Sequence, residues 1–72
     1  MKTTPWFSAL QKPVRPGVYQ RKLTLTHAIL YYYWDGQTWW ASGRTPDEAD
    51  MMQGVARSYW QTRFKWRGVI NE

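Results

Sequence analysis

The chain has 72 residues and no cysteine, so it forms one domain at most and contains neither a disulfide nor a thiolate metal site. A domain of this size buries only about 60% of the surface of its unfolded chain, so its aromatic content of 18% has to supply much of the core. Ten basic residues oppose five acidic ones, and three of those acids lie within residues 47–50. The resulting charge of +5 favours anionic partners such as nucleic acid.

No segment has the length and apolar character of a membrane span. The longest apolar run, residues 28–34, is far shorter than the roughly 20 residues that a bilayer requires. Residues 6–10 are too short and too interrupted for the core of a signal peptide. We therefore expect a cytoplasmic protein that does not bind a membrane.

The N-terminal segment is expected to be an extended arm. Its residues, 1–16, show no sustained periodicity and are interrupted by Pro5, Pro13 and Pro16. Proline fixes φ and lacks a backbone donor, which disfavours both a helix and a central strand. Trp6 and Phe7 are too apolar for a free tail, so we expect them to pack on the domain or on a partner. Residues 17–72 then form a single small domain.

Two strands are predicted next along the chain. Residues 18–25 alternate, with Tyr19 and Leu23 on one face and Gln20 and Lys22 on the other. Residues 27–34 follow as a second strand, because they are rich in side chains that suit a pleated surface.

Asp35 and Gly36 predict a hairpin turn of type I′, which needs positive φ at both loop positions. A two-residue loop would pair Trp34 with Gln37 and Tyr31 with Trp40. Both faces of the hairpin would then be aromatic, because side chains alternate across a sheet. One face would carry Tyr31, Tyr33, Thr38 and Trp40, and the other Tyr32, Trp34, Gln37 and Trp39.

A helix is predicted to follow, from Thr45 to about Ser58. Thr45 and Glu48 form a capping box around Pro46 at the first helical position. Apolar residues then recur at helical spacing. We expect the apolar side of the helix to pack on the face that holds Tyr32, Trp34 and Trp39, through Met52, Val55 and Tyr59.

Residues 60–70 alternate with period two and predict an extended segment. One side carries Trp60, Thr62, Phe64 and Trp66, and the other carries Gln61, Arg63, Lys65 and Arg67. The predicted fold class is α+β: a small antiparallel β-sheet, either a hairpin or a three-stranded meander, packed against one α-helix, with a C-terminal strand or extended tail.

The sequence offers little for catalysis. A single histidine, His27, and the absence of cysteine exclude most nucleophile–base pairs and ordinary zinc sites. The acids of residues 47–50 match the positive end of a helix dipole. We therefore expect a protein that is not an enzyme and has no cofactor, no metal and no catalytic residues.

Three short motifs resemble those of small bacteriophage and prophage proteins of unknown activity. These proteins share a PGVYE-like start, a YWDG turn and a WRG ending; here the segments are residues 16–20, 33–36 and 66–68. The similarity spans most of residues 13–69. It implies a phage or prophage origin and a bacterial cytoplasm, without an activity to transfer.

The spacing of Tyr19 and Trp40 also resembles that of WW domains, which bind proline-rich peptides through a tyrosine and their second tryptophan. The chain departs from that family in three ways, one of which is that the Asn-His pair expected after the tyrosines is absent. Tyr19 stands where the first signature tryptophan would be, and a predicted helix follows the strands.

Two functions remain open at this point. The first is a protein-interaction module, binding another protein or itself through an aromatic sheet surface formed by Tyr31, Tyr33 and Trp40. The alternative is binding of single-stranded nucleic acid, with Arg63, Lys65 and Arg67 on the phosphates and open rings stacked on the bases.

Overall fold

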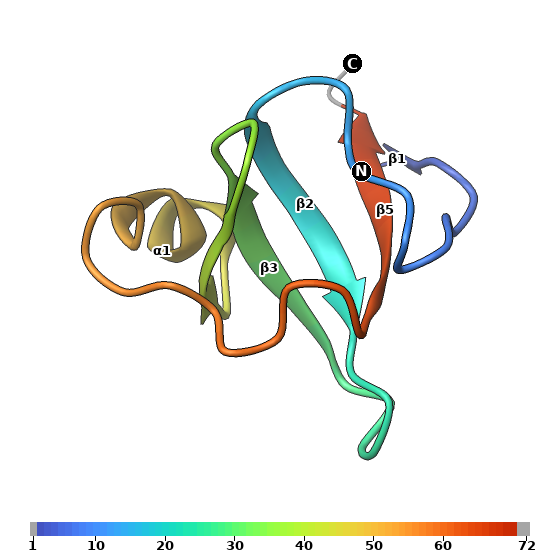
Figure 1. Ribbon diagram of the computed structural model, residues 1–72. Coiled ribbons are helices and arrows are strands. Elements are labelled where there is room, and N and C mark those ends of the chain that lie inside the picture. Colours follow the sequence, from blue (N-terminus) through green and yellow to red (C-terminus); the bar gives the residue numbers. More distant parts are fainter. Residues whose placement is uncertain (1, 71–72) are drawn as a thin grey trace.

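The computed structural model describes residues 2–70, and most of its regular structure is an antiparallel sheet of five strands. The strands are β1 (Lys2–Thr3), β2 (Gly17–Lys22), β3 (Ile29–Trp34), β4 (Trp39–Gly43) and β5 (Lys65–Ile70), in the order β1-β5-β2-β3-β4. One short helix, α1 (Pro46–Met51), lies beside β3 and β4 (Figure 1). The predicted antiparallel sheet with a single helix is confirmed, but the fold is mostly β rather than an even α+β mixture.

The sheet is larger than predicted because the C-terminal segment joins it. Strands β2, β3 and β4 form the predicted meander. Strand β5 then pairs with the free edge of β2, and β1 covers the outer edge of β5 (Figure 1). The choice between a C-terminal strand and an extended tail is thus decided in favour of the strand.

The β3–β4 turn is wider than the predicted two-residue loop. Trp34 pairs with Trp39, so residues 35–38 form the loop and the predicted register is wrong. The carboxylate of Asp35 causes this, because it accepts hydrogen bonds from the backbone N–H groups of Gln37 (2.8 Å) and Thr38 (2.7 Å). Gly36 has the positive φ expected of it, at 103°, but Asp35 does not, so the predicted type I′ turn is wrong.

Helix α1 begins as predicted and ends early. Thr45 is the N-cap and its hydroxyl accepts from the Glu48 N–H (3.2 Å), but the helix stops at Met51 instead of near Ser58. Gly54 adopts φ 75° three residues later, which turns the chain away from the helical path. Val55 and Tyr59 are consequently 71% and 85% exposed, so their predicted packing on the core is wrong.

The helix contacts the sheet through small residues. Ala49 is fully buried, and a Cβ at Gly43 would lie only 2.4 Å from the backbone nitrogen of Ala49. Beyond the helix, the chain runs along β4: Ala41 N–H donates to Ala56 O (2.8 Å) and Ser58 N–H to Trp39 O (2.9 Å). This segment therefore protects an edge strand of the sheet.

One face of the sheet holds the aromatic core. Its buried members are Tyr32, Trp34, Trp39 and Trp66, with ring centroids of Trp34 and Trp39 5.0 Å apart. The N-terminal arm completes this face, because Phe7 stacks on Trp66 at 4.6 Å and the two backbones exchange hydrogen bonds. The predicted grouping of Tyr32, Trp34 and Trp39 on one face is confirmed, although the arm and the C-terminal segment cover it instead of the helix.

A buried cation lies within this core. Arg21 is fully buried, with its guanidinium carbon 4.6 Å from the ring centroids of Tyr32 and Trp39 and 5.0 Å from that of Phe64. It donates to the carbonyl oxygen of Trp60 (2.9 Å), which ties the segment before β5 to the sheet. Burial lowers the pKa of Arg21 to about 10, and Tyr32 opposes that shift.

Replacing Arg21 with lysine tests this arrangement. We expect Arg21→Lys to lower the free energy of unfolding by about 2–3 kcal/mol, because an ammonium cannot stack against the rings and also reach Trp60 with the same planar geometry. Urea denaturation at neutral pH measures the loss. Arg44→Lys, at an exposed position, is the control and should change stability by less than about 0.5 kcal/mol. Equal stability of both variants would contradict a structural role for Arg21.

Candidate functional site

The face of the sheet opposite the core, called here the open face, combines tyrosines with basic side chains. Strand alternation and cross-strand register place on it Val18, Gln20 and Lys22 from β2, Ile29, Tyr31 and Tyr33 from β3, and Lys65, Arg67 and Val69 from β5. Strands β2, β3 and β5 contain no aspartate or glutamate. The strands of this face are therefore positively charged and partly aromatic. Its β3–β4 side is covered by α1, because Gly43, the register partner of Tyr31, lies against the backbone of Ala49. The first turn of α1 carries Asp47 and Glu48.

A row of hydrogen-bonded side chains crosses the middle of this face. Arg67, Gln20 and Tyr31 are register partners on adjacent strands. The Arg67 Nε donates to Gln20 Oε1 (2.7 Å), and Gln20 Nε2 donates to the Tyr31 hydroxyl (3.2 Å). Trp6, from the arm, lies 4.3 Å from the guanidinium carbon of Arg67. Each side chain in the row is held by the next, which fixes the position of the guanidinium.

The neighbouring row places two like charges opposite each other. Lys22 on β2 is the direct register partner of Lys65 on β5. Like charges in this arrangement destabilise a sheet. An anion bound between them would remove that repulsion, so the pair favours a negatively charged ligand.

The structure brings together parts of the two predicted sites and separates others. Tyr31 and Tyr33, predicted as an interaction surface, share the open face with Lys65 and Arg67, predicted as nucleic-acid contacts. Arg63 precedes β5, with its guanidinium over the Trp60 ring at 4.6 Å.

Trp40 follows the buried Trp39 and lies at the irregularity opposite Tyr33, so no direct register pair ties it to the rings of Tyr31 and Tyr33. Its indole N–H donates to Asp35 (3.0 Å), and Arg57 lies over its ring at 5.8 Å.

Three residues of this surface were not predicted as site residues: Trp6, Gln20 and Lys22. The alternation of residues 18–25 already placed Gln20 and Lys22 together on the polar side of β2. What it could not indicate was that β5 pairs with β2 and so brings Arg67 and Lys65 beside them.

The described residues form neither a metal-binding cluster nor a membrane-spanning helix. Within residues 2–70, no group of three or more histidine, aspartate or glutamate side chains is placed to hold a metal ion. The same part of the chain has no helix long and apolar enough to cross a membrane. The open face offers a ligand cations, hydrogen-bond donors and ring faces.

Comparison of the chain with protein-family models, with curated proteins and with solved structures found no match.

The turn that contains Asp35 should make the stability of the fold depend on pH. Hydrogen bonds from the backbone N–H groups of Gln37 and Thr38 lower the pKa of Asp35, with smaller contributions from the Trp40 indole and Arg57. Because this pKa is lower in the folded chain, the stabilisation is present above the ordinary value of about 3.9 and is lost as the pH falls through the folded value.

The variant Asp35→Asn keeps an oxygen acceptor but does not titrate. We therefore expect the fall in stability between about pH 6 and about pH 2.5 to be smaller in this variant than in the wild type. Urea denaturation at both pH values measures it, with Asp47→Asn on α1 as a control for removal of one acid. An unchanged pH dependence in Asp35→Asn would contradict the role assigned to this carboxylate.

Proposed function

We propose that this chain is a non-enzymatic binding protein that holds single-stranded nucleic acid on the open face of its sheet. The observation that carries the proposal is the direct opposition of Lys22 and Lys65 on a face whose strands contain no acid. Phosphates would neutralise this pair and Arg67. The resemblance of residues 16–20, 33–36 and 66–68 to motifs of phage and prophage proteins supports a phage-type origin.

The tyrosines of the same face provide rings on which the bases of a single strand would stack. Tyr33 and Tyr31 are half-buried on β3, two residues apart, so their side chains project from the same side of the strand. Base stacking on such rings contributes about 1–3 kcal/mol per base and tolerates any sequence. Strands that are basic and partly aromatic and contain no acid favour a single nucleic-acid strand over an uncharged peptide.

Salt dependence tests the electrostatic part. With about three phosphates neutralised, a plot of log affinity against log salt concentration should have a slope of about −2 for a single strand. Fluorescence anisotropy of a labelled oligothymidine between about 25 and about 200 mM salt measures it. Lys65→Gln should make the slope shallower by about 0.7, whereas Arg44→Gln, on the connection before α1, should leave it unchanged. No binding at low salt would refute the proposal.

Stacking is tested separately. Tyr33→Ala should weaken binding by about 1–3 kcal/mol at every salt concentration without changing the slope, because a ring contact releases no counterion. Tyr59→Ala, at an exposed ring outside the sheet, is the matched control. Equal losses in the two variants would place the bases elsewhere than on the open face.

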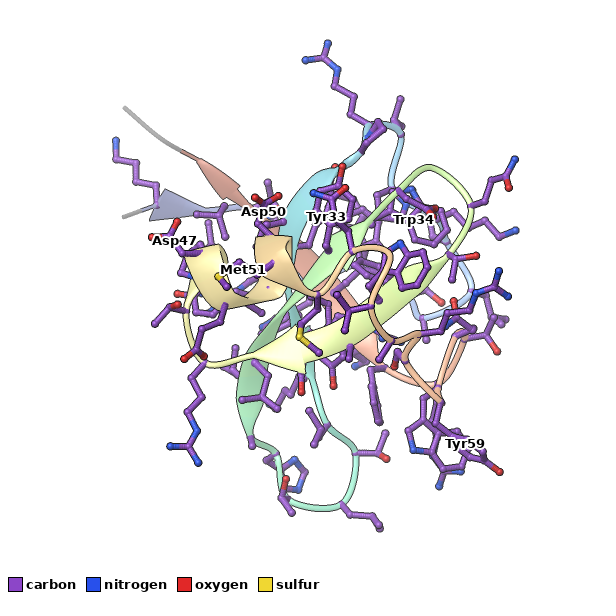
Figure 2. All side chains as sticks on the ribbon, turned by 90° about the vertical axis from the view of Figure 1, so that its left-hand side faces the viewer. Tyr33, Trp34, Asp47, Asp50, Met51 and Tyr59 are labelled. Atoms are coloured by element: carbon purple, nitrogen blue, oxygen red, sulfur yellow. The ribbon has the colours of Figure 1, made fainter. Side chains whose placement is uncertain are left out.

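A second candidate function is self-association or binding of a protein partner, supported by an exposed aromatic pair. Tyr59 is 85% and Trp60 41% exposed, and their ring centroids lie 4.7 Å apart. Figure 2 shows Tyr59 on the outside of the molecule, far from Met51 on α1. Exposed apolar groups of this kind commonly mark interfaces. Sedimentation velocity at micromolar concentration distinguishes the two: a dimer that Tyr59→Ser converts to a monomer would support this candidate, and a wild-type monomer would count against self-association.

A further inference from the structure

A hollow of about 490 Å³ lies at the end of the open face, where β2 leads into its turn towards β3. Three segments form its walls: the N-terminal arm, the end of β2 with the turn, and the chain entering β5. Its lining residues include Trp6 and Ser8 from the first segment, Lys22, Thr24 and His27 from the second, and Arg63 and Lys65 from the third.

The lining is basic and contains no acid. Lys22, Lys65 and Arg63 bring three positive charges into one concave space, and no aspartate or glutamate lines it among the described residues. The hydroxyl groups of Ser8 and Thr24 add neutral hydrogen-bonding groups. This is the donor set that a phosphate group requires.

Arg63 is oriented before any ligand arrives. Its guanidinium carbon lies 4.6 Å from the centroid of the Trp60 ring, and its Nε donates to the Thr24 hydroxyl (3.4 Å). The other wall is also held, because Trp6 stacks with Arg67. Side chains already fixed in this way lose little entropy on binding, which favours a specific site over a diffuse basic patch.

The turn that closes the hollow has an unusual backbone. His27 adopts φ 58°, the only positive φ at a residue other than glycine within residues 2–70. Two hydrogen bonds maintain it: His27 N–H to Leu23 O (3.0 Å) and Leu23 N–H to Ala28 O (2.9 Å). This conformation is uncommon for a residue with a Cβ, and it is part of the turn that brings the imidazole into the lining of the hollow.

The order of the rows on the open face indicates how a ligand would reach the hollow. Following β2 from its start, the sheet presents Tyr33 opposite Val18, then the Arg67–Gln20–Tyr31 row, then the Lys22–Lys65 pair. The hollow comes next, and the turn and the arm form its walls. A strand lying along β2 would end there.

We propose that this hollow binds a phosphate monoester, and that its natural form is the terminal phosphate of the single strand whose bases lie over the tyrosines. This inference rests on the proposed function. A monoester carries about −1.5 to −2 charges at neutral pH, whereas an internal phosphodiester carries one. Three converging cations therefore bind the end of a phosphorylated strand more tightly than its interior.

The test compares one labelled oligothymidine in three forms: with a 5′-phosphate, with a 3′-phosphate and without a terminal phosphate. We expect one phosphorylated form to bind at least about tenfold more tightly than the unphosphorylated form in anisotropy titrations at low salt. Arg63→Gln should abolish this preference, so that the three forms bind with equal affinity. Arg44→Gln removes the same charge outside the hollow and should preserve the preference.

The possible results separate the inference from the function on which it rests. Equal binding of the three oligonucleotides would overturn the terminal-phosphate site while leaving nucleic-acid binding intact. A preference that survives both Arg63→Gln and Lys22→Gln would also overturn it, since the phosphate would then bind elsewhere. Absence of binding to all three forms would refute the proposed function itself. Tighter binding of a phosphoserine peptide than of any oligonucleotide would assign the hollow to another class of partner and overturn the inference.

Discussion

The fold depends on a cation surrounded by aromatic rings. Arg21 is fully buried, and its neighbours are the rings of Tyr32, Trp39 and Phe64 and the carbonyl oxygen of Trp60. A buried charge without an acid is costly unless other groups replace its hydration. Here ring faces and a carbonyl oxygen do so. The same contacts fix the segment that leads into β5, so a chain without disulfides obtains a crosslink between distant parts of its sequence.

Strand β5 connects this core to the surface that we propose as functional. Trp66 faces inward beside Arg21, while Lys65 and Arg67 face outward next to Lys22 and Gln20. Anything that displaces β5 would therefore disturb both faces together. This coupling explains why the open face can hold like charges close together: the stabilising contacts are on the other side of the same strands, and they outweigh the local repulsion.

The local patterns predicted much of the candidate site but not its assembly. Alternation along residues 60–70 correctly separated Phe64 and Trp66 from Lys65 and Arg67, and the capping box correctly located the start of α1. The length of the helix and the register of the hairpin were predicted incorrectly. Both errors arise from particular side-chain and backbone interactions: Asp35 binds the backbone of its own turn, and Gly54 takes a positive φ soon after Met51.

By itself the sequence determined which side chains share a face of each strand, because that follows from the two-residue period of any extended chain. It also determined the excess of positive charge and the need for an aromatic core. Only the tertiary structure decided that β5 pairs with β2, which brings Lys65 opposite Lys22 and Arg67 beside Gln20. Such pairing joins residues more than forty positions apart. It coincides with the packing of Arg21 and the rings on the opposite face, and no local pattern encodes it.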